Sequence, residues 1–174
     1  MTEPLATYTL YDGSEYSVLE RPEGPEDALI MRFRLGPDCA VPPPHVHPHT
    51  TETFEVLQGE FEVLVEAQWQ AVQAGASAAV EPGVRHTFRN HSGAEVVIRN
   101  VHDPHHGFEP YIRAIAELSQ EFRTTDARSA RAAARMAVLW GRHDDLIRPA
   151  DLPLKLAFPI LRAFARIARI SPPD

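Results

Sequence analysis

Cysteine is nearly absent from the chain: Cys39 is the only one in 174 residues. A lone cysteine cannot form an intramolecular disulfide, and this composition is typical of a reducing compartment, so we expect a cytoplasmic protein. No apolar run approaches the roughly 20 residues that a membrane-spanning helix needs. The first residues, MTEPLATYTLYDGSE, lack the basic and apolar regions of a secretory signal. We therefore expect no membrane partner.

Basic residues are scarce over most of the chain. Residues 1–110 carry six Arg and Lys against 17 Asp and Glu, whereas residues 111–174 carry eleven against seven. Phosphate backbones repel an acidic body, so the net charge of −7 predicts no nucleic-acid partner. With 44% hydrophobic and 24% charged residues, the composition is that of an ordinary globular domain.

Short apolar or alternating runs, separated by turn residues, fill the first 102 residues. The clearest run is residues 28–35, in which Met31, Phe33 and Leu35 alternate with two arginines. Many short strands without an intervening helix are typical of a sandwich or a barrel. The expected strands are Thr7–Tyr11, Tyr16–Leu19, Ala28–Leu35, Thr53–Leu57, Phe61–Glu66, Ser77–Val80, His86–Asn90 and Glu95–Val101.

The composition changes near Pro104 to Ala, Leu, Ile and Arg without strand alternation. This predicts a β domain over residues 1–103 and a helical extension over residues 104–174. We expect Asp126 and Asp151 to cap the second and third helices, Gly141 to end the second and Pro159 to kink or split the third. The expected helices are Glu109–Phe122, Ala127–Trp140 and Leu152–Ile170.

The third predicted helix is amphipathic. Its basic residues share one face, and its apolar residues lie on the others. Such a helix can rest on an anionic membrane, or it can pack on its own domain or on a partner subunit. We expect it to pack, because most amphipathic helices in globular proteins face a core. The basic residues are Lys155, Arg162, Arg166 and Arg169, and the apolar ones are Leu154, Phe158, Leu161, Phe164 and Ile167.

Histidine is concentrated in the β region, with eight of the nine between residues 45 and 106. In an extended chain, residues two apart point to the same face, so His45 and His47 project together, and His49 continues the alternation. Glu52 follows closely, and a second segment supplies His86. Neutral imidazoles that converge with a carboxylate are a standard site for a divalent metal.

These two segments resemble the two motifs of the cupin superfamily. In the first motif, His-x-His is followed by four residues, Glu, six residues and Gly, matched here by His45, His47, Glu52 and Gly59. The second motif is matched by Gly75, Gly83, His86 and Asn90. Two motifs in the right order and separation are specific, and the short stretch between them is similar to that of small single-barrel bacterial cupins.

The sequence departs from the family pattern at two places. Eight residues separate Gly36 from His45, where the pattern has five, and Glu81 stands where the second motif has proline. Neither change removes a metal-ligand position. Glu81 adds a carboxylate near the expected rim of the site.

The resemblance implies a fold and a ligand set. The expected fold is an all-β, cupin-type antiparallel double-sheet β-barrel, or jelly roll, with the C-terminal α-helical extension. His45, His47, Glu52 and His86 would bind one divalent metal ion per chain, either Fe, Mn, Ni, Cu or Zn. Small cupins commonly form dimers, so we expect a homodimer.

The resemblance also implies dioxygenase-type chemistry on a small organic molecule, in which Glu52 is the catalytic residue because it can move a proton as well as bind the metal. Two alternatives stay open. One is a non-catalytic, metal-dependent binding or sensor protein for a small ligand. The other is a metal-dependent isomerase or cyclase. The discriminating observation would be the bound metal, because zinc has no redox chemistry.

The remaining polar candidates have weaker signals. His49 either faces the cavity or is a solvent-facing loop residue, and we expect the latter. His102, His105 and His106 lie where the chain leaves the last strand. They could form a second metal site or line the mouth of the cavity, but we expect a solvated connector. Thr50 and Asn90 are candidates for contacts behind the ligands or for a structural role. Phe54, Phe61 and Phe88 are expected in the core wall.

Overall fold

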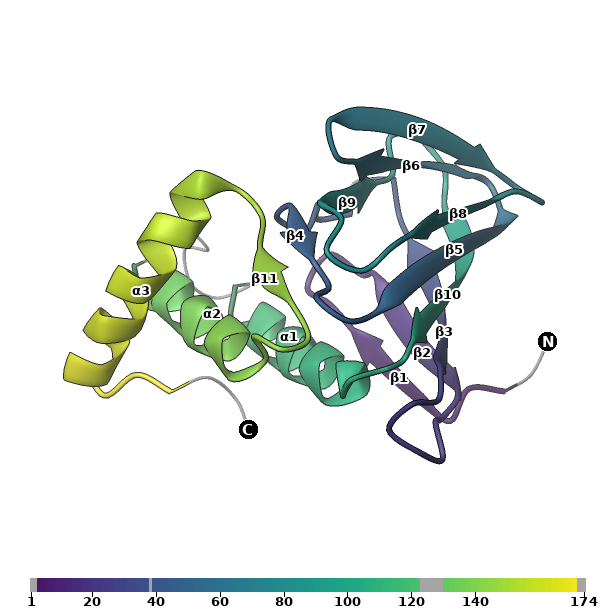
Figure 1. Ribbon diagram of the computed structural model, residues 1–174. Coiled ribbons are helices and arrows are strands. Elements are labelled where there is room, and N and C mark those ends of the chain that lie inside the picture. The colour runs from purple at the N-terminus through teal and green to yellow at the C-terminus, as the bar shows by residue number, and fades with distance from the viewer. Residues whose placement is uncertain (1–2, 38, 123–129, 172–174) are drawn as a thin grey trace.

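The computed structural model describes residues 3–37, 39–122 and 130–171, and it contains two antiparallel sheets with three helices gathered at one end (Figure 1). The first sheet has six strands, and two of them lie side by side so that His102 of one strand is opposite Glu52 of the other. In spatial order the strands are β1 (Ala6–Thr9), β2 (Glu15–Glu20), β3 (Leu29–Leu35), β10 (Val96–Asp103), β5 (Thr51–Gln58) and β8 (Ser77–Val80).

The second sheet has five strands and faces the first. In spatial order they are β11 (Arg148–Pro149), β4 (His45–Val46), β9 (His86–Arg89), β6 (Glu60–Val65) and β7 (Gln68–Gln73). The two sheets form a jelly-roll sandwich, which confirms the expected cupin-type antiparallel fold with C-terminal helices.

The core lies between the sheets because the strands alternate as the sequence predicts. Met31, Phe33 and Leu35 on β3 are each at most 1% exposed. Phe54 and Phe61 reach the same core from the neighbouring strands and are equally buried. Burying each such side chain contributes roughly 1.5–3 kcal/mol, which makes this core the main source of stability.

Three strands were not predicted. β7 carries the sequence QWQAVQ, of which only Val72 is buried, so it has little apolar signal. β4 and β11 have two residues each, too few for a period to be recognised. β11 belongs to the C-terminal extension yet pairs with β4, so the extension contributes an edge strand to the second sheet.

The helices are α1 (Phe108–Phe122), α2 (Ala130–Arg142) and α3 (Leu152–Ile167). Gly141 was expected to end α2, but it lies within the last turn of the helix. A Cβ atom there would lie 2.8 Å from Cδ of Arg162, so the glycine lets α3 approach α2 closely. The predicted cap Asp126 lies outside the described residues.

The predictions for α3 are partly wrong. The helix continues through Pro159 without a break. Asp151 stands at the N-cap position, but its side chain accepts a hydrogen bond from Arg85 Nε (2.9 Å) and caps nothing. Phe158 packs on Trp140 of α2 with ring centroids 5.4 Å apart, whereas Phe164 and Ile167 remain exposed in the single chain. No helix among the described residues is long and apolar enough to cross a membrane.

Glu109 fastens α1 to the first sheet. Its carboxylate accepts two hydrogen bonds from Nε and Nη2 of Arg21 and a third from the Tyr8 hydroxyl (2.9 Å). Hydrogen bonds from Arg21 hold the pKa of the Glu109 carboxyl below its usual range. These hydrogen bonds hold the start of α1 against β1 and the segment that follows β2.

Replacing Glu109 with Gln is expected to lower the free energy of unfolding by about 1 kcal/mol at neutral pH, because a charged pair with a half-exposed arginine is lost. The contribution of Glu109 is full above the ordinary pKa of a glutamate and is lost as the pH falls through the lowered pKa. Urea unfolding at neutral and acidic pH should show less loss of stability on acidification in the variant. Equal acid sensitivity in the two proteins would contradict this account.

Candidate metal centre

The four side chains that the motifs single out converge between the two sheets. His45 and His86 are opposite each other on β4 and β9, and Glu52 lies on β5 of the other sheet. His47 follows β4. All four are buried, and one potential ligand atom from each lies within 4.8 Å of the others. This cluster can hold a metal ion.

Backbone carbonyls fix the orientation of the three imidazoles. Nδ1 of His45 lies 2.9 Å from the carbonyl oxygen of Pro43, and Nδ1 of His86 lies 2.9 Å from that of Val84. Nδ1 of His47 lies 2.7 Å from the carbonyl oxygen of residue 146. A carbonyl can only accept, so each Nδ1 carries the proton and donates it. Each Nε2 is then free to bind a cation.

The Glu52 carboxylate sits among these rings. Its Oε2 lies 3.0 Å from Nε2 of His86 and 3.6 Å from Nε2 of His47. Nδ1 of His86 is already a donor, so in the neutral ring Nε2 and Oε2 would oppose each other as lone pairs. A shared proton or a cation between them removes that conflict, and the donor set therefore fits a divalent ion.

The pKa values follow from burial and from the neighbouring groups. Burial would raise the pKa of Glu52, but His102, His47 and His86 outweigh it and hold that pKa well below the usual range. Burial, together with the two other imidazoles, lowers the pKa of His45 well below its ordinary value. Burial alone would lower the pKa of His86, yet the hydrogen bond with Glu52 raises it. An ionised carboxylate beside a neutral His45 is the charge state that a metal ion needs.

His102 is a site residue that the sequence reading placed wrongly. We expected a solvated connector, but β10 continues through Asp103 and His102 is fully buried. Its ring stacks on Phe108 at 3.5 Å between centroids, and its Nε2 lies 3.5 Å from Oε1 of Glu52. Burial lowers its pKa to about 3, so it is a further, neutral imidazole next to the four-residue cluster.

The other histidines lie away from the cluster. His49 is exposed, as expected of a solvent-facing loop residue, and its ring lies 5.6 Å from that of His106, which is also exposed. His105 is half-buried, and its Nδ1 accepts a hydrogen bond from the backbone of Gly107. The expectation of a connector therefore holds for His105 and His106.

Asn100 is the second residue that the sequence reading missed. It lies on β10, fully buried, and its Nδ2 donates to Oε1 of Glu52 at 2.9 Å. Asn90 instead donates to the carbonyls of Leu35, Gly36 and Ala94, and so has a structural role. Asn100 is thus the residue that orients the Glu52 carboxylate.

Replacing Asn100 with Ala is expected to weaken zinc binding by about 10–100-fold, the usual effect of losing a group that orients a ligand. Asn90→Ala is the matched control, because it removes an equally buried amide that does not touch the cluster. It should destabilise the fold and leave the zinc affinity unchanged. Competition with a fluorescent chelator measures both, and equal loss of affinity in the two variants would contradict the assignment.

The C-terminal extension helps to position the His-x-His segment of the cluster. Leu146 follows α2, and its carbonyl is the acceptor for His47 Nδ1. Two residues later β11 pairs with β4, with Pro149 opposite His45, and the amide of Ala150 donates to the carbonyl of Pro44 (3.0 Å). The His-x-His segment is therefore held between β9 and the extension.

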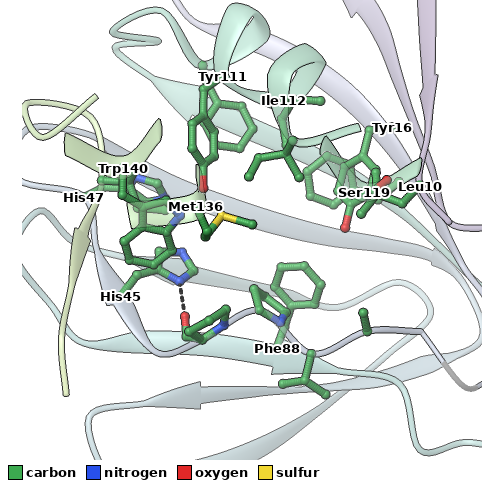
Figure 2. Close-up of a pocket in the computed structure, with 18 of the residues that line it drawn as sticks. Leu10, Tyr16, His45, His47, Phe88, Tyr111, Ile112, Ser119, Met136 and Trp140 are labelled. Atoms are coloured by element: carbon green, nitrogen blue, oxygen red, sulfur yellow. Dashed lines mark hydrogen bonds between the residues drawn. The ribbon is translucent and has the colours of Figure 1, made fainter. Parts of the chain in front are cut away.

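A cavity of about 250 Å³ opens beside the cluster, and His45, His47 and Glu52 form part of its wall. The sandwich contributes Phe33 and Phe88, while Phe54 and Phe61 belong to the core only, as expected. The helices cover the other side. Figure 2 shows Tyr111 and Ile112 reaching in from α1 and Met136 and Trp140 from α2.

The family model of the cupin domain matches residues 31–102, a span that holds both motifs and strands β3 to β10. Residues 31–102 form a cupin domain. The resemblance seen in the sequence is thereby confirmed. No curated protein matches the chain.

Several solved structures are similar to this cupin. The TT1209 protein of Thermus thermophilus is 24% identical, with a TM-score of 0.48 over 57% of this chain and 90% of that chain. A predicted oxalate decarboxylase from Thermotoga maritima is 19% identical, with a TM-score of 0.48 over 59% of this chain and 92% of that chain. KdgF from Halomonas sp. is 20% identical, with a TM-score of 0.47 over 57% of this chain and 83% of that chain. Likeness at this level says nothing of the reaction.

Proposed function

We propose that this cupin binds one divalent metal ion through His45, His47, Glu52 and His86 and carries out dioxygenase-type chemistry on a small organic molecule. The observation that supports this most is the convergence of four buried donor atoms within 4.8 Å at the wall of a cavity. Three histidines and one carboxylate leave coordination positions open on an ion that accepts five or six ligands, as a catalytic site needs.

The chain's own groups have defined tasks in this proposal. The three Nδ1–H groups hold the imidazoles with Nε2 toward the centre, and Asn100 holds Oε1 of Glu52. A bound redox-active ion would supply oxygen activation, and zinc would supply a Lewis acid only. Oε2 of Glu52 faces the same space and is the chain's acceptor for a proton from a substrate hydroxyl. The helices α1 and α2 cover one side of the cavity.

Oxygen uptake separates this proposal from the alternatives. Protein loaded with iron(II) should consume oxygen with small aromatic diols, and protein loaded with zinc should consume none. Product formation with zinc, without oxygen, would favour an isomerase or cyclase. Binding of these compounds without turnover, whichever of iron, manganese, nickel, copper or zinc is loaded, would favour a binding or sensor protein.

Three further expectations stay predictions from the sequence. They are the homodimer, the cytoplasmic location, and the absence of nucleic-acid and membrane partners. Light scattering of the purified protein tests the first of these directly.

A further inference from the structure

The lining of the cavity beside the four-residue cluster is unusual for a site that would bind polar metabolites. Among the described residues that line it, Glu52 and the two histidines are the only ionisable groups besides two tyrosines. Burial raises the pKa of both Tyr16 and Tyr111, so both are neutral. The described lining therefore offers no arginine or lysine to a carboxylate, a phosphate or a sulfonate.

The other polar side-chain groups at the wall are few: the hydroxyls of Tyr16, Tyr111 and Ser119 and the indole N–H of Trp140. The Ser119 hydroxyl donates to the carbonyl of Ala116 (2.7 Å) and accepts from the backbone of Tyr11 (3.2 Å). Leu10, Ile112, Ile115 and Met136 contribute hydrocarbon to the wall. A sugar, which carries a hydroxyl on nearly every carbon, would lose its hydration here and would find hydrogen-bond partners for only a few of its hydroxyls.

The volume limits the size of the occupant. The cavity of about 250 Å³ has room for a molecule of about one aromatic ring with a short substituent, or a branched hydrocarbon of similar size. Drug-sized ligands need larger pockets, typically 300–1,000 Å³, so a roughly monocyclic molecule fits best.

We infer that the substrate is a small, uncharged and mostly apolar molecule, whose body lies against the α1–α2 wall and whose single oxygen-bearing end faces Glu52, His45 and His47. This rests on the proposed function, because it names the substrate class of the same site. Dicarboxylates and sugars are excluded by the same lining. The helical extension, which lies outside the matched cupin domain, supplies the wall that selects the substrate.

Two compounds with the same diol head test the inference. 4-Ethylcatechol has a neutral apolar tail, and 3,4-dihydroxybenzoate is nearly the same size but carries a carboxylate. Calorimetry on the full chain, with zinc and without metal, should show 4-ethylcatechol binding at least about 30-fold more tightly in both forms, because a buried carboxylate would have no partner. Equal affinities, tighter binding of the benzoate, or no binding of 4-ethylcatechol to either form would overturn the inference.

A substitution can place a cationic side chain at the cavity wall, which has none among its described residues. Ile115 is half-buried on α1 at the cavity wall, so Ile115→Lys can place an ammonium there while keeping its stem on apolar surface. It should shift the preference toward 3,4-dihydroxybenzoate by at least about tenfold. Ile98→Val is the control, because Ile98 is buried in the core away from the cavity. An unchanged preference in a folded Ile115→Lys protein would contradict the proposed wall.

The two proposals fail in different ways. If the metal centre is wrong, zinc changes the affinity of neither diol, yet the preference for the neutral tail remains. If the substrate class is wrong, zinc strengthens the binding of both diols and the preference is absent.

Discussion

Replacing Glu52 with Gln is expected to remove metal binding from a folded protein and, with it, the thermal stabilisation that metal provides. The carboxylate is the only anion among the buried cluster, and an amide neither balances the charge of a divalent ion nor binds it as strongly. Zinc at about a hundred times its Kd should stabilise the wild type by about 2.7 kcal/mol. For a chain of this size that corresponds to roughly 5–11 °C in Tm.

Glu55→Gln is the matched control. Glu55 lies on the same strand, but its carboxylate faces outward and pairs with Arg99 at 3.0 Å. Its substitution should leave the zinc-induced rise in Tm intact, because an exposed pair contributes little. Differential scanning calorimetry with and without zinc measures both variants. A Glu52→Gln protein that still gains the wild-type increment would show that zinc binds elsewhere.

Replacing Trp140 with Ala is expected to have the largest effect on stability, about 3–5 kcal/mol, as for other buried aromatic side chains. Trp140 is 4% exposed, packs edge-on against Phe158 of α3, and lies 6.3 Å from the ring of His45. Its loss enlarges the cavity and loosens the turn that brings the Leu146 carbonyl to His47. Zinc affinity should therefore fall as well.

Trp69→Ala provides the comparison for that experiment. Trp69 is 37% exposed on β7 and is covered by the guanidinium of Arg89, 3.8 Å from the ring centroid. An exposed cation–π contact contributes about 0.5–1 kcal/mol, so this substitution should be mild and should not change zinc affinity. Chemical unfolding and chelator competition decide between the two expectations. Similar effects in both variants would contradict the role given to Trp140.

The four cluster residues could be predicted because their signal is local. His45 and His47 are two apart on an extended segment, and Glu52 follows within one motif. This spacing can be recognised even where the boundaries of the surrounding strands are predicted wrongly. Gly59 belongs to the same motif for a steric reason, because a Cβ there would lie 2.8 Å from the carbonyl oxygen of Glu95.

His102 and Asn100 were missed although the sequence contains a signal for them. β10 buries every second residue from Val96 to His102. The alternation already places Asn100 on the inner face of the predicted strand, and extending it by one residue would have added His102. The prediction ended the strand at Val101 because Asp, Pro and paired histidines follow, and these residues are typical of a connector.

The contribution of the C-terminal extension to the cavity and the cluster could not be predicted, because it depends on contacts between distant parts of the chain. Nothing local in the segment around Leu146 indicates that its carbonyl meets His47, 99 residues earlier. β11 contains only two residues, one of them a proline, and is recognisable only through its partner β4. Helical periodicity predicts that α1 and α2 bury a face, but not which surface they cover.

Metal content of the purified, untagged protein, measured by elemental mass spectrometry beside His47→Ala and His86→Ala, tests the central claim most directly. We expect about one divalent ion per wild-type chain and almost none in either variant, because three donors bind a divalent ion far more weakly than four. Wild-type protein without metal that also takes up none on reconstitution, or variants that keep a full equivalent, would contradict the metal centre. The buried histidines would then be a hydrogen-bonded polar cluster in the wall of a metal-free binding cavity.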